Sequence, residues 1–348
     1  MPVPRRMQHR PFPDLRMTAL HDYRAPWWLP GGDLQTIWPA LLLRPWRAAG
    51  PAYRRERWQA PDGDFIDVDH LQGARGAPWL VLFHGLEGSS SSHYAVAFAQ
   101  AAKARGWHFS VPHFRGCSGE PNLAPRSYHS GDFEEIGWML GRIREAAGAP
   151  VLAAGVSLGG NALLRWAEEA GSTATPVVRA LAAVSAPLDL AAAGAAIDRG
   201  FNRLAYAQHF LRTMKPHALA KWQQHPRLFD RERLIAARTL REFDDCFTAP
   251  LHGFSSVDDY WRRASAKPHL VAIRVPTLVF NARNDPFVPE QSLPNPNQAG
   301  PEVMLWQPDH GGHVGFPTGR FPGHVHAMPE AVCDWLEAAA ATEASHPL

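Results

Sequence analysis

The sequence predicts an α/β fold in which a mostly parallel, twisted sheet is covered by helices on both faces and carries an inserted helical lid. Three observations support this prediction. Short apolar runs that are typical of buried strands alternate with stretches of helical periodicity. This alternation stops over residues 190–266 and then resumes. One apolar run ends in Gly155-Val-Ser157-Leu-Gly159, which is typical of a sharp strand-to-helix turn.

The change of pattern divides the 348-residue chain into three parts. Residues 1–50 are expected to form an arm that packs on the core. Residues 51–189 and 267–348 form the α/β core, and residues 190–266 form the lid. The stretch 1–16 is basic and contains prolines but lacks the apolar centre of a secretory signal, so we expect a cytoplasmic protein.

The arm contains an unusual run, Pro26-Trp-Trp-Leu-Pro-Gly-Gly-Asp-Leu-Gln-Thr-Ile-Trp38-Pro39. Its prolines and glycines are expected to break regular structure, whereas its tryptophans favour burial. We therefore expect this run to pack across the domain surface or the mouth of a site. It suggests no catalytic role.

The elements of the core follow in order. An antiparallel hairpin comes first, because two alternating runs flank a Pro-Asp-Gly turn. Helix ends are predicted at Gly106 and Gly148, and Asp132 with Glu135 resembles a capping box at a helix start. The predicted strands are 53–59, 65–70, 79–83, 107–112, 151–156, 177–185, 276–281 and 302–306, and the predicted core helices are 94–105, 133–147, 161–170 and 328–341.

Ser157 is the candidate nucleophile. In a nucleophile elbow the strand turns into a helix so tightly that a Cβ at either flanking glycine would clash, and the serine hydroxyl stands clear at the carboxyl edge of the sheet. The apolar run before Ser157 and the helical pattern after it supply this context.

The loop His84-Gly-Leu-Glu-Gly88 follows another buried strand at the same edge. Acyl transfer produces an oxyanion that is held by two backbone N–H groups, one from the residue after the nucleophile and one from such a loop. We assign these donors to Leu158 and Leu86. His84 is interpreted as a structural residue that braces the loop. Arg115 is interpreted as a brace for the carbonyl groups of the next loop, with contact to a substrate as the alternative.

An acid and a base are expected after the last two strands. Asp285 follows the penultimate strand, with Asp189 and Asp309 as rivals, and loop position favours Asp285. The last loop contains two histidines, His310 and His313.

The joint order of these motifs resembles the YheT-type α/β-hydrolases, also called the abhydrolase-4 family, which includes eukaryotic abhydrolase-domain lipases. The resemblance extends over roughly residues 25–340. It rests on Leu34-Gln-Thr-Ile37, His84-Gly-Leu-Glu-Gly88, Phe114-Arg-Gly-Cys-Ser-Gly119, Gly155-Val-Ser-Leu-Gly-Gly160, Asn284-Asp-Pro-Phe287 and His310-Gly-Gly-His-Val-Gly-Phe316.

This resemblance implies the α/β-hydrolase fold and hydrolysis of a carboxylic ester by the triad Ser157, Asp285 and His313. His313 is preferred to His310 because the resemblance places the base there, and because Gly311-Gly312 gives the backbone freedom to swing the side chain over the serine. The expected partner is a small-molecule ester with short- to medium-chain acyl groups, and no cofactor is needed. Acyl transfer to an alcohol or perhydrolysis by the same triad remains an alternative, as does, less readily, a non-catalytic binding module.

Composition argues against other classes. A net charge of +2 without a basic block does not suggest nucleic-acid binding, and no apolar run is long enough to span a membrane, although peripheral contact is left open. Cys117, Cys246 and Cys333 are interpreted as thiols. The cluster His310, His313, His324 and His326 lacks a metal-site spacing.

The lid is rich in aromatic residues. Most are expected to form its own core, and some to line an apolar pocket for an acyl chain. They are Phe201, Tyr206, Phe210, Trp222, Phe229, Phe243, Phe247, Phe254, Tyr260 and Trp261.

Overall fold

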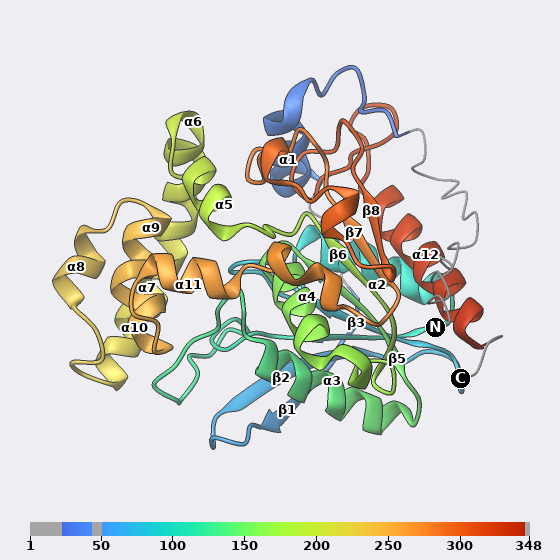
Figure 1. Ribbon diagram of the computed structural model, residues 1–348, viewed down its shortest axis with the longest axis horizontal. Helices are drawn as coiled ribbons and strands as arrows, with labels where there is room; N and C mark the ends of the chain where they lie inside the picture. The colour runs from blue at the N-terminus through green and yellow to red at the C-terminus, as the bar shows by residue number, and fades with distance from the viewer. Residues whose placement is uncertain (1–22, 44–50, 345–348) are drawn as a thin grey trace, which may run out of the picture.

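A single eight-stranded sheet organises the computed structural model, which describes residues 23–43 and 51–344. The strand order is β1-β2-β4-β3-β5-β6-β7-β8. The pairs β1·β2 and β2·β4 are antiparallel, and every other pair is parallel (Figure 1). The predicted α/β class with a mostly parallel sheet is confirmed. The strands are β1 (Arg54–Gln59), β2 (Phe65–Leu71), β3 (Trp79–Phe83), β4 (His108–Pro112), β5 (Val151–Val156), β6 (Val178–Val184), β7 (Thr277–Phe280) and β8 (Val303–Trp306).

Helices cover both faces of this sheet, as predicted. One face packs on α2 and α12, where Phe98 and Trp335 join the side chain of Phe109 in a buried cluster. The opposite face packs on α3 and α4 through Ile136 and Leu163. These helices are α2 (His93–Ala104), α3 (Phe133–Ala147), α4 (Leu158–Ala170) and α12 (Ala327–Ala344).

The 190–266 segment is helical. Its helices gather at one end of the molecule, on the left of Figure 1. Its buried side chains form clusters of their own, including one around Phe229, Phe243 and Phe247, and few of them join the cores of the sheet. The helices are α5 (Leu190–Ile197), α6 (Gly200–Asn202), α7 (Gln208–Gln224), α8 (Arg231–Ala236), α9 (Leu240–Phe243), α10 (Ala249–Leu251) and α11 (Val257–Ala264), and π-helical turns occupy Arg203–Ala207 and Asp244–Thr248.

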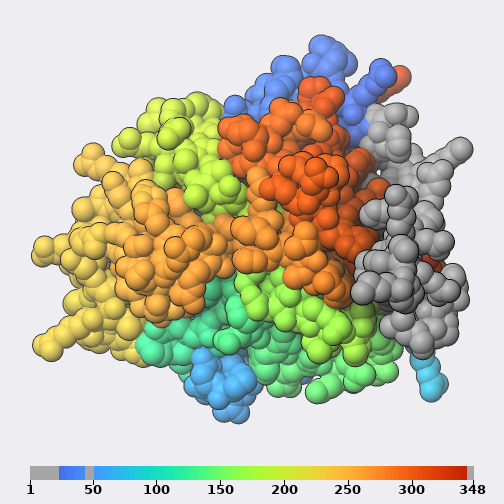
Figure 2. Space-filling model, in the orientation of Figure 1, coloured from blue at the N-terminus to red at the C-terminus, as the bar shows by residue number. Residues whose placement is uncertain are grey.

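Three expectations are wrong. The run that was expected to break regular structure forms a helix, α1 (Gly31–Leu42), with Pro39 inside it, and Trp27 is 92% exposed. α1 packs against the segments that follow β7 and β8 (Figure 2). The basic stretch 1–16 lies outside the described residues.

The other two errors concern charged side chains. Asp132 and Glu135 form no capping box, because Asp132 pairs with Arg126 at 2.5 Å and Glu135 with Arg115 at 2.5 Å. Arg115 braces its loop through the carboxylates of Glu135 and Asp64, not through carbonyl groups. Burial made these pairings necessary, since a buried charge is costly unless it is paired.

Candidate active site

Ser157 lies between β5 and α4 in a backbone conformation that few residues adopt, with φ 53° and ψ −121°. A Cβ on Gly159 would lie 2.4 Å from the carbonyl oxygen of His84, and one on Gly155 would lie 2.5 Å from that of Gly159. No side chain fits at either position. The two glycines therefore allow the tight turn that the sequence predicts.

The structure brings Ser157, His313 and Asp285 together, although they lie far apart in the sequence. The Ser157 hydroxyl is 3.0 Å from Nε2 of His313, and Nδ1 of His313 is 2.8 Å from Oδ2 of Asp285. The other carboxylate oxygen of Asp285 accepts the backbone N–H groups of Phe287 and Val288. Because a carboxylate can only accept, Nδ1 carries the proton and Nε2 is free to accept the proton of the serine.

The rival residues lie elsewhere. His310 is exposed and approaches the Asn284 side chain at 3.5 Å. Asp189 caps α5 by accepting the N–H of Ala192, and the side chain of Asp309 is 84% exposed. None of the three contacts the Ser157 hydroxyl or the His313 ring.

Leu86 and Leu158 both present backbone N–H groups near this serine. Leu158 is the first residue of α4, so its N–H has no acceptor within the helix. In the loop after β3, Gly85 donates its N–H to the Tyr94 hydroxyl and Glu87 donates to the Tyr128 hydroxyl. Leu86 N–H, between them, has no acceptor among the described residues. Both groups are available to an oxyanion.

His84 braces this loop, in agreement with its interpretation from the sequence as a structural residue. Its Nδ1–H donates to the carbonyl of Gly85, and its Nε2 accepts the N–H of Phe114. Burial lowers the pKa of His84 to about 3, so the ring is neutral. Both ring nitrogens are occupied, which leaves neither for proton transfer.

A cavity of about 420 Å³ adjoins Ser157 and His313. One wall comes from the 190–266 segment, and it includes aromatic residues and Met214. The aromatic residues of the segment that line the cavity are Phe210, Phe243, Phe247, Tyr260 and Trp261.

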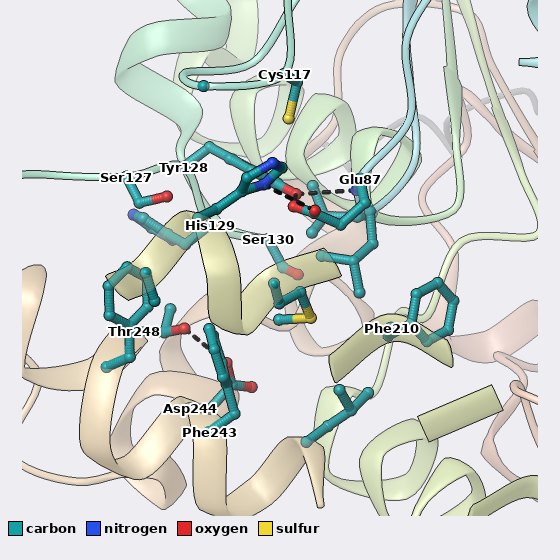
Figure 3. A pocket seen from close by; sticks show the side chains of 18 of the residues that line it. Glu87, Cys117, Ser127, Tyr128, His129, Ser130, Phe210, Phe243, Asp244 and Thr248 are labelled. Carbon is teal, nitrogen blue, oxygen red and sulfur yellow. Dashed lines mark hydrogen bonds and ion pairs between the residues drawn. The ribbon is translucent and has the colours of Figure 1, made fainter. Parts of the chain in front are cut away.

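The opposite wall is polar and comes from the loops after β3 and β4 (Figure 3). There the Tyr128 hydroxyl donates to Glu87. Glu87 also lies 2.9 Å from His217 of α7, and this carboxylate raises the pKa of His217. Burial lowers the pKa of Lys221, also on α7, to about 8, while its ammonium group donates to backbone carbonyls of the 122–124 loop. These contacts tie α7 to the core at the rim of the cavity.

Sequence reasoning missed the side chains that hold the His313 loop. Gln35 and Thr36 of α1 accept backbone N–H groups of this loop. The signal was the motif Leu34-Gln-Thr-Ile37, which contributed to the family resemblance but was given no role at the site.

Two possible features are absent from the described parts of the chain. Over residues 23–43 and 51–344, no three His, Cys, Asp or Glu side chains are grouped so as to hold a metal ion. Within the same ranges, no helix combines the length and apolarity needed to cross a bilayer.

Comparisons with known proteins show the family to which the chain is similar. Residues 78–319 match the family model described as alpha/beta hydrolase fold. The chain is 40% identical over 309 residues to "Putative esterase YheT" of Escherichia coli (strain K12), covering 87% of this chain and 89% of that protein. It is 31% identical over 313 residues to phospholipase ABHD3 of Mus musculus, covering 85% of this chain and 75% of that protein.

Among solved structures, the esterase EaEST from Exiguobacterium antarcticum matches with a TM-score of 0.50 and 14% identity, covering 82% of this chain and all of that one. At this identity the likeness is one of fold alone.

Proposed function

The chain belongs to the α/β-hydrolase family, in its YheT-type branch, and from this premise we propose that it is a serine carboxylic-ester hydrolase that acts through an acyl-enzyme. The observation that carries the proposal is the continuous hydrogen-bond chain from Ser157 through His313 to Asp285. This arrangement activates a serine hydroxyl as a nucleophile. The esterase and phospholipase names of its relatives support the same reaction class.

In the proposed first step, Nε2 of His313 takes the proton of the Ser157 hydroxyl while the serine oxygen attacks the carbonyl carbon of the ester. Asp285 holds the Nδ1–H tautomer and stabilises the imidazolium that forms. The carbonyl oxygen becomes an anion that accepts the N–H groups of Leu86 and Leu158. Each such donor is worth about 3 to 4 kcal/mol in transition-state stabilisation.

The tetrahedral intermediate then collapses. The bond to the alcohol oxygen breaks, and the alcohol leaves with the proton that His313 holds. In the second half of the reaction, water gives a proton to Nε2 of His313 and attacks the acyl-enzyme. The carboxylic acid is released and Ser157 recovers its proton.

The cavity supports a role for the 190–266 segment as a lid over an acyl pocket. Five of the aromatic residues expected in the lid line this cavity. An apolar wall of this kind favours an acyl chain over a polar group, because burial removes apolar surface from water. A volume of about 420 Å³ suits a short- to medium-chain acyl group.

Replacement of the nucleophile tests the proposal. The variant Ser157→Ala should lose hydrolysis of a p-nitrophenyl ester by a factor on the order of 10⁶ in kcat, and it should no longer react with a fluorophosphonate probe. Its thermal midpoint should change little. Labelling of the variant at the parent's rate would remove Ser157 from the mechanism.

A further inference from the structure

The backbone of the His313 loop is held by side chains from three other parts of the chain. Four consecutive N–H groups in this loop each donate to a side-chain oxygen, at distances of 2.8 to 3.1 Å. The pairs are Gly311 with Gln35, Gly312 with Asn284, His313 with Thr36, and Val314 with Ser185.

Two of these acceptors are adjacent residues of α1, and both are buried. The side-chain amide of Gln35 donates to the carbonyl of Leu29, so its oxygen is left to accept. The Thr36 hydroxyl donates to the carbonyl of Gly32, so its lone pairs are left for the N–H of His313 at 2.8 Å. The side-chain donors of Gln35 and Thr36 thus bond to carbonyl groups within or just before α1, whereas their oxygens face the His313 loop.

Gln35 also contacts the loop that carries the acid. Its Oε1 accepts the side-chain N–H of Asn284 at 2.9 Å as well as the N–H of Gly311. Asn284 immediately precedes Asp285. A single buried side-chain oxygen therefore joins the loop of the acid to the loop of the base.

The packing between α1 and the two loops leaves little room for movement. A Cβ on Gly312 would lie 2.8 Å from the Thr36 hydroxyl oxygen, and one on Gly315 would lie 1.9 Å from the carbonyl oxygen of Gln35. A Cβ on Gly32 would lie 1.9 Å from the carbonyl oxygen of Asn284. Backbone therefore lies directly on backbone, and neither loop can shift relative to α1 without a clash.

We propose that Gln35 and Thr36 are positioning residues that fix the backbone of the His313 loop, so that the imidazole stays aligned between Asp285 and Ser157. This inference rests on the triad proposed above. Neither residue lines the cavity, so both act through His313 and not on the substrate. Catalysis depends on this alignment, because a displacement of about 1 Å can cost about 10²-fold in rate.

The test compares isosteric variants. Thr36→Val keeps the shape of the side chain but removes the acceptor for His313 N–H, and it should lower kcat for a p-nitrophenyl ester about tenfold with little change in KM. Fluorophosphonate labelling should slow in parallel. Thr36→Ser, which restores the hydroxyl, should return kcat to near the parent value.

Gln35→Leu provides a second variant. It removes the acceptor for both Gly311 and Asn284, so its loss in kcat should exceed that of Thr36→Val. Thr277→Val is the matched control, because Thr277 is a buried threonine whose hydroxyl donates to a backbone carbonyl at the start of β7, away from both loops. It should lower the midpoint of urea unfolding without changing kcat.

The outcomes separate this inference from the proposed function. Parent-like kcat in folded Thr36→Val or folded Gln35→Leu, with only the unfolding midpoint lowered, would mean a structural role and overturn the inference. An equal loss of kcat in Thr277→Val would overturn it too. Undiminished activity in Ser157→Ala would instead overturn the proposed function.

Discussion

At the scale of single residues, Ser157 shows how the fold maintains a strained backbone. A conformation with φ 53° costs about 1 to 3 kcal/mol for a residue with a side chain. Its N–H donates to the carbonyl of Val184 at 2.8 Å, and its own carbonyl accepts the N–H groups of Gly160 and Asn161. These bonds lock the turn from both sides. Because these bonds fix the backbone of Ser157 in one conformation, its hydroxyl stays within hydrogen-bond distance of His313.

The partners of Ser157 yield a prediction at the same scale. His313→Ala should reduce kcat about as far as Ser157→Ala does, because the serine then has no proton acceptor. Asp285→Asn should keep the fold but lower kcat by roughly 10⁴, because an amide favours the wrong imidazole tautomer. Steady-state hydrolysis of a p-nitrophenyl ester measures both effects.

His310→Ala is the control for this pair. His310 is exposed and makes only a 3.5 Å contact with Asn284, so its loss should leave kcat within a few-fold of the parent value. If His310→Ala proved more damaging than His313→Ala, the assignment of the base within the last motif would be wrong.

At the scale of elements, the core could be predicted because its signals are local. The central strands β3 and β5 are uninterrupted apolar runs, and the helix that ends before Gly148 stops where this glycine adopts φ 68°. The predicted strands and core helices agree with the structure to within three residues at each end. The order of Ser157, Asp285 and His313 along the chain then followed from the positions of the strands.

α1 could not be predicted because its stability comes from distant partners. Its sequence contains two glycines and an internal proline, which all disfavour a helix. The helix is held instead by contacts with loops some 250 residues further along, including the Gln35 bond to Asn284.

The capping-box prediction for Asp132 and Glu135 was wrong for a similar reason. Their spacing suggested a local helix cap, but their partners are arginines elsewhere, Arg126 and Arg115.

The 190–266 segment gives a prediction about substrate length. Each additional CH₂ that is buried in the cavity contributes about 0.8 kcal/mol, so extending an acyl chain from two to six carbons could improve transition-state binding by up to about 3 kcal/mol. We expect kcat/KM for p-nitrophenyl esters to rise with acyl length and then to fall where the cavity ends. A profile that is flat, or highest for acetate, would show that the aromatic residues serve only packing.

A variant of α7 sharpens this measurement. Ala218 is buried and lines the cavity, so Ala218→Phe should move the maximum of the profile to a shorter acyl chain. Thr213→Phe places the same side chain on the exposed side of the same helix and should leave the profile unchanged. An equal shift in both variants would argue against an acyl pocket under α7.

At the scale of the whole molecule, Asp64 connects regions that surround the cavity. This buried carboxylate follows β1 and accepts hydrogen bonds from Arg115 and Asn122 at 2.7 Å, and from the backbone N–H of Leu123. Lys221 of α7 in turn donates to the carbonyl of Asn122. The hairpin, the 115–124 loop and the 190–266 segment are therefore joined through one small network.

This network predicts how stability depends on pH. Burial alone would raise the pKa of Asp64, but hydrogen bonds from Asn122 and from backbone N–H groups outweigh burial and lower it from 3.8 to about 2. The unfolded chain therefore binds the proton more tightly than the folded chain. The stabilisation is present above about pH 4 and is lost as the pH falls from there through about 2. The shift corresponds to about 2.5 kcal/mol.

Urea unfolding at several pH values between 6 and 3 measures this contribution. Asp64→Asn should be less stable than the parent at pH 6, because it loses the charged acceptor that faces Arg115. The difference should narrow as the pH falls below about 4, because the unfolded parent then takes up a proton at Asp64 that the folded parent does not bind until about pH 2. Asp309→Asn, which removes an exposed carboxylate, should follow the parent at every pH. A gap between Asp64→Asn and the parent that stays constant down to pH 3 would mean that packing, and not the charge of Asp64, carries this contribution.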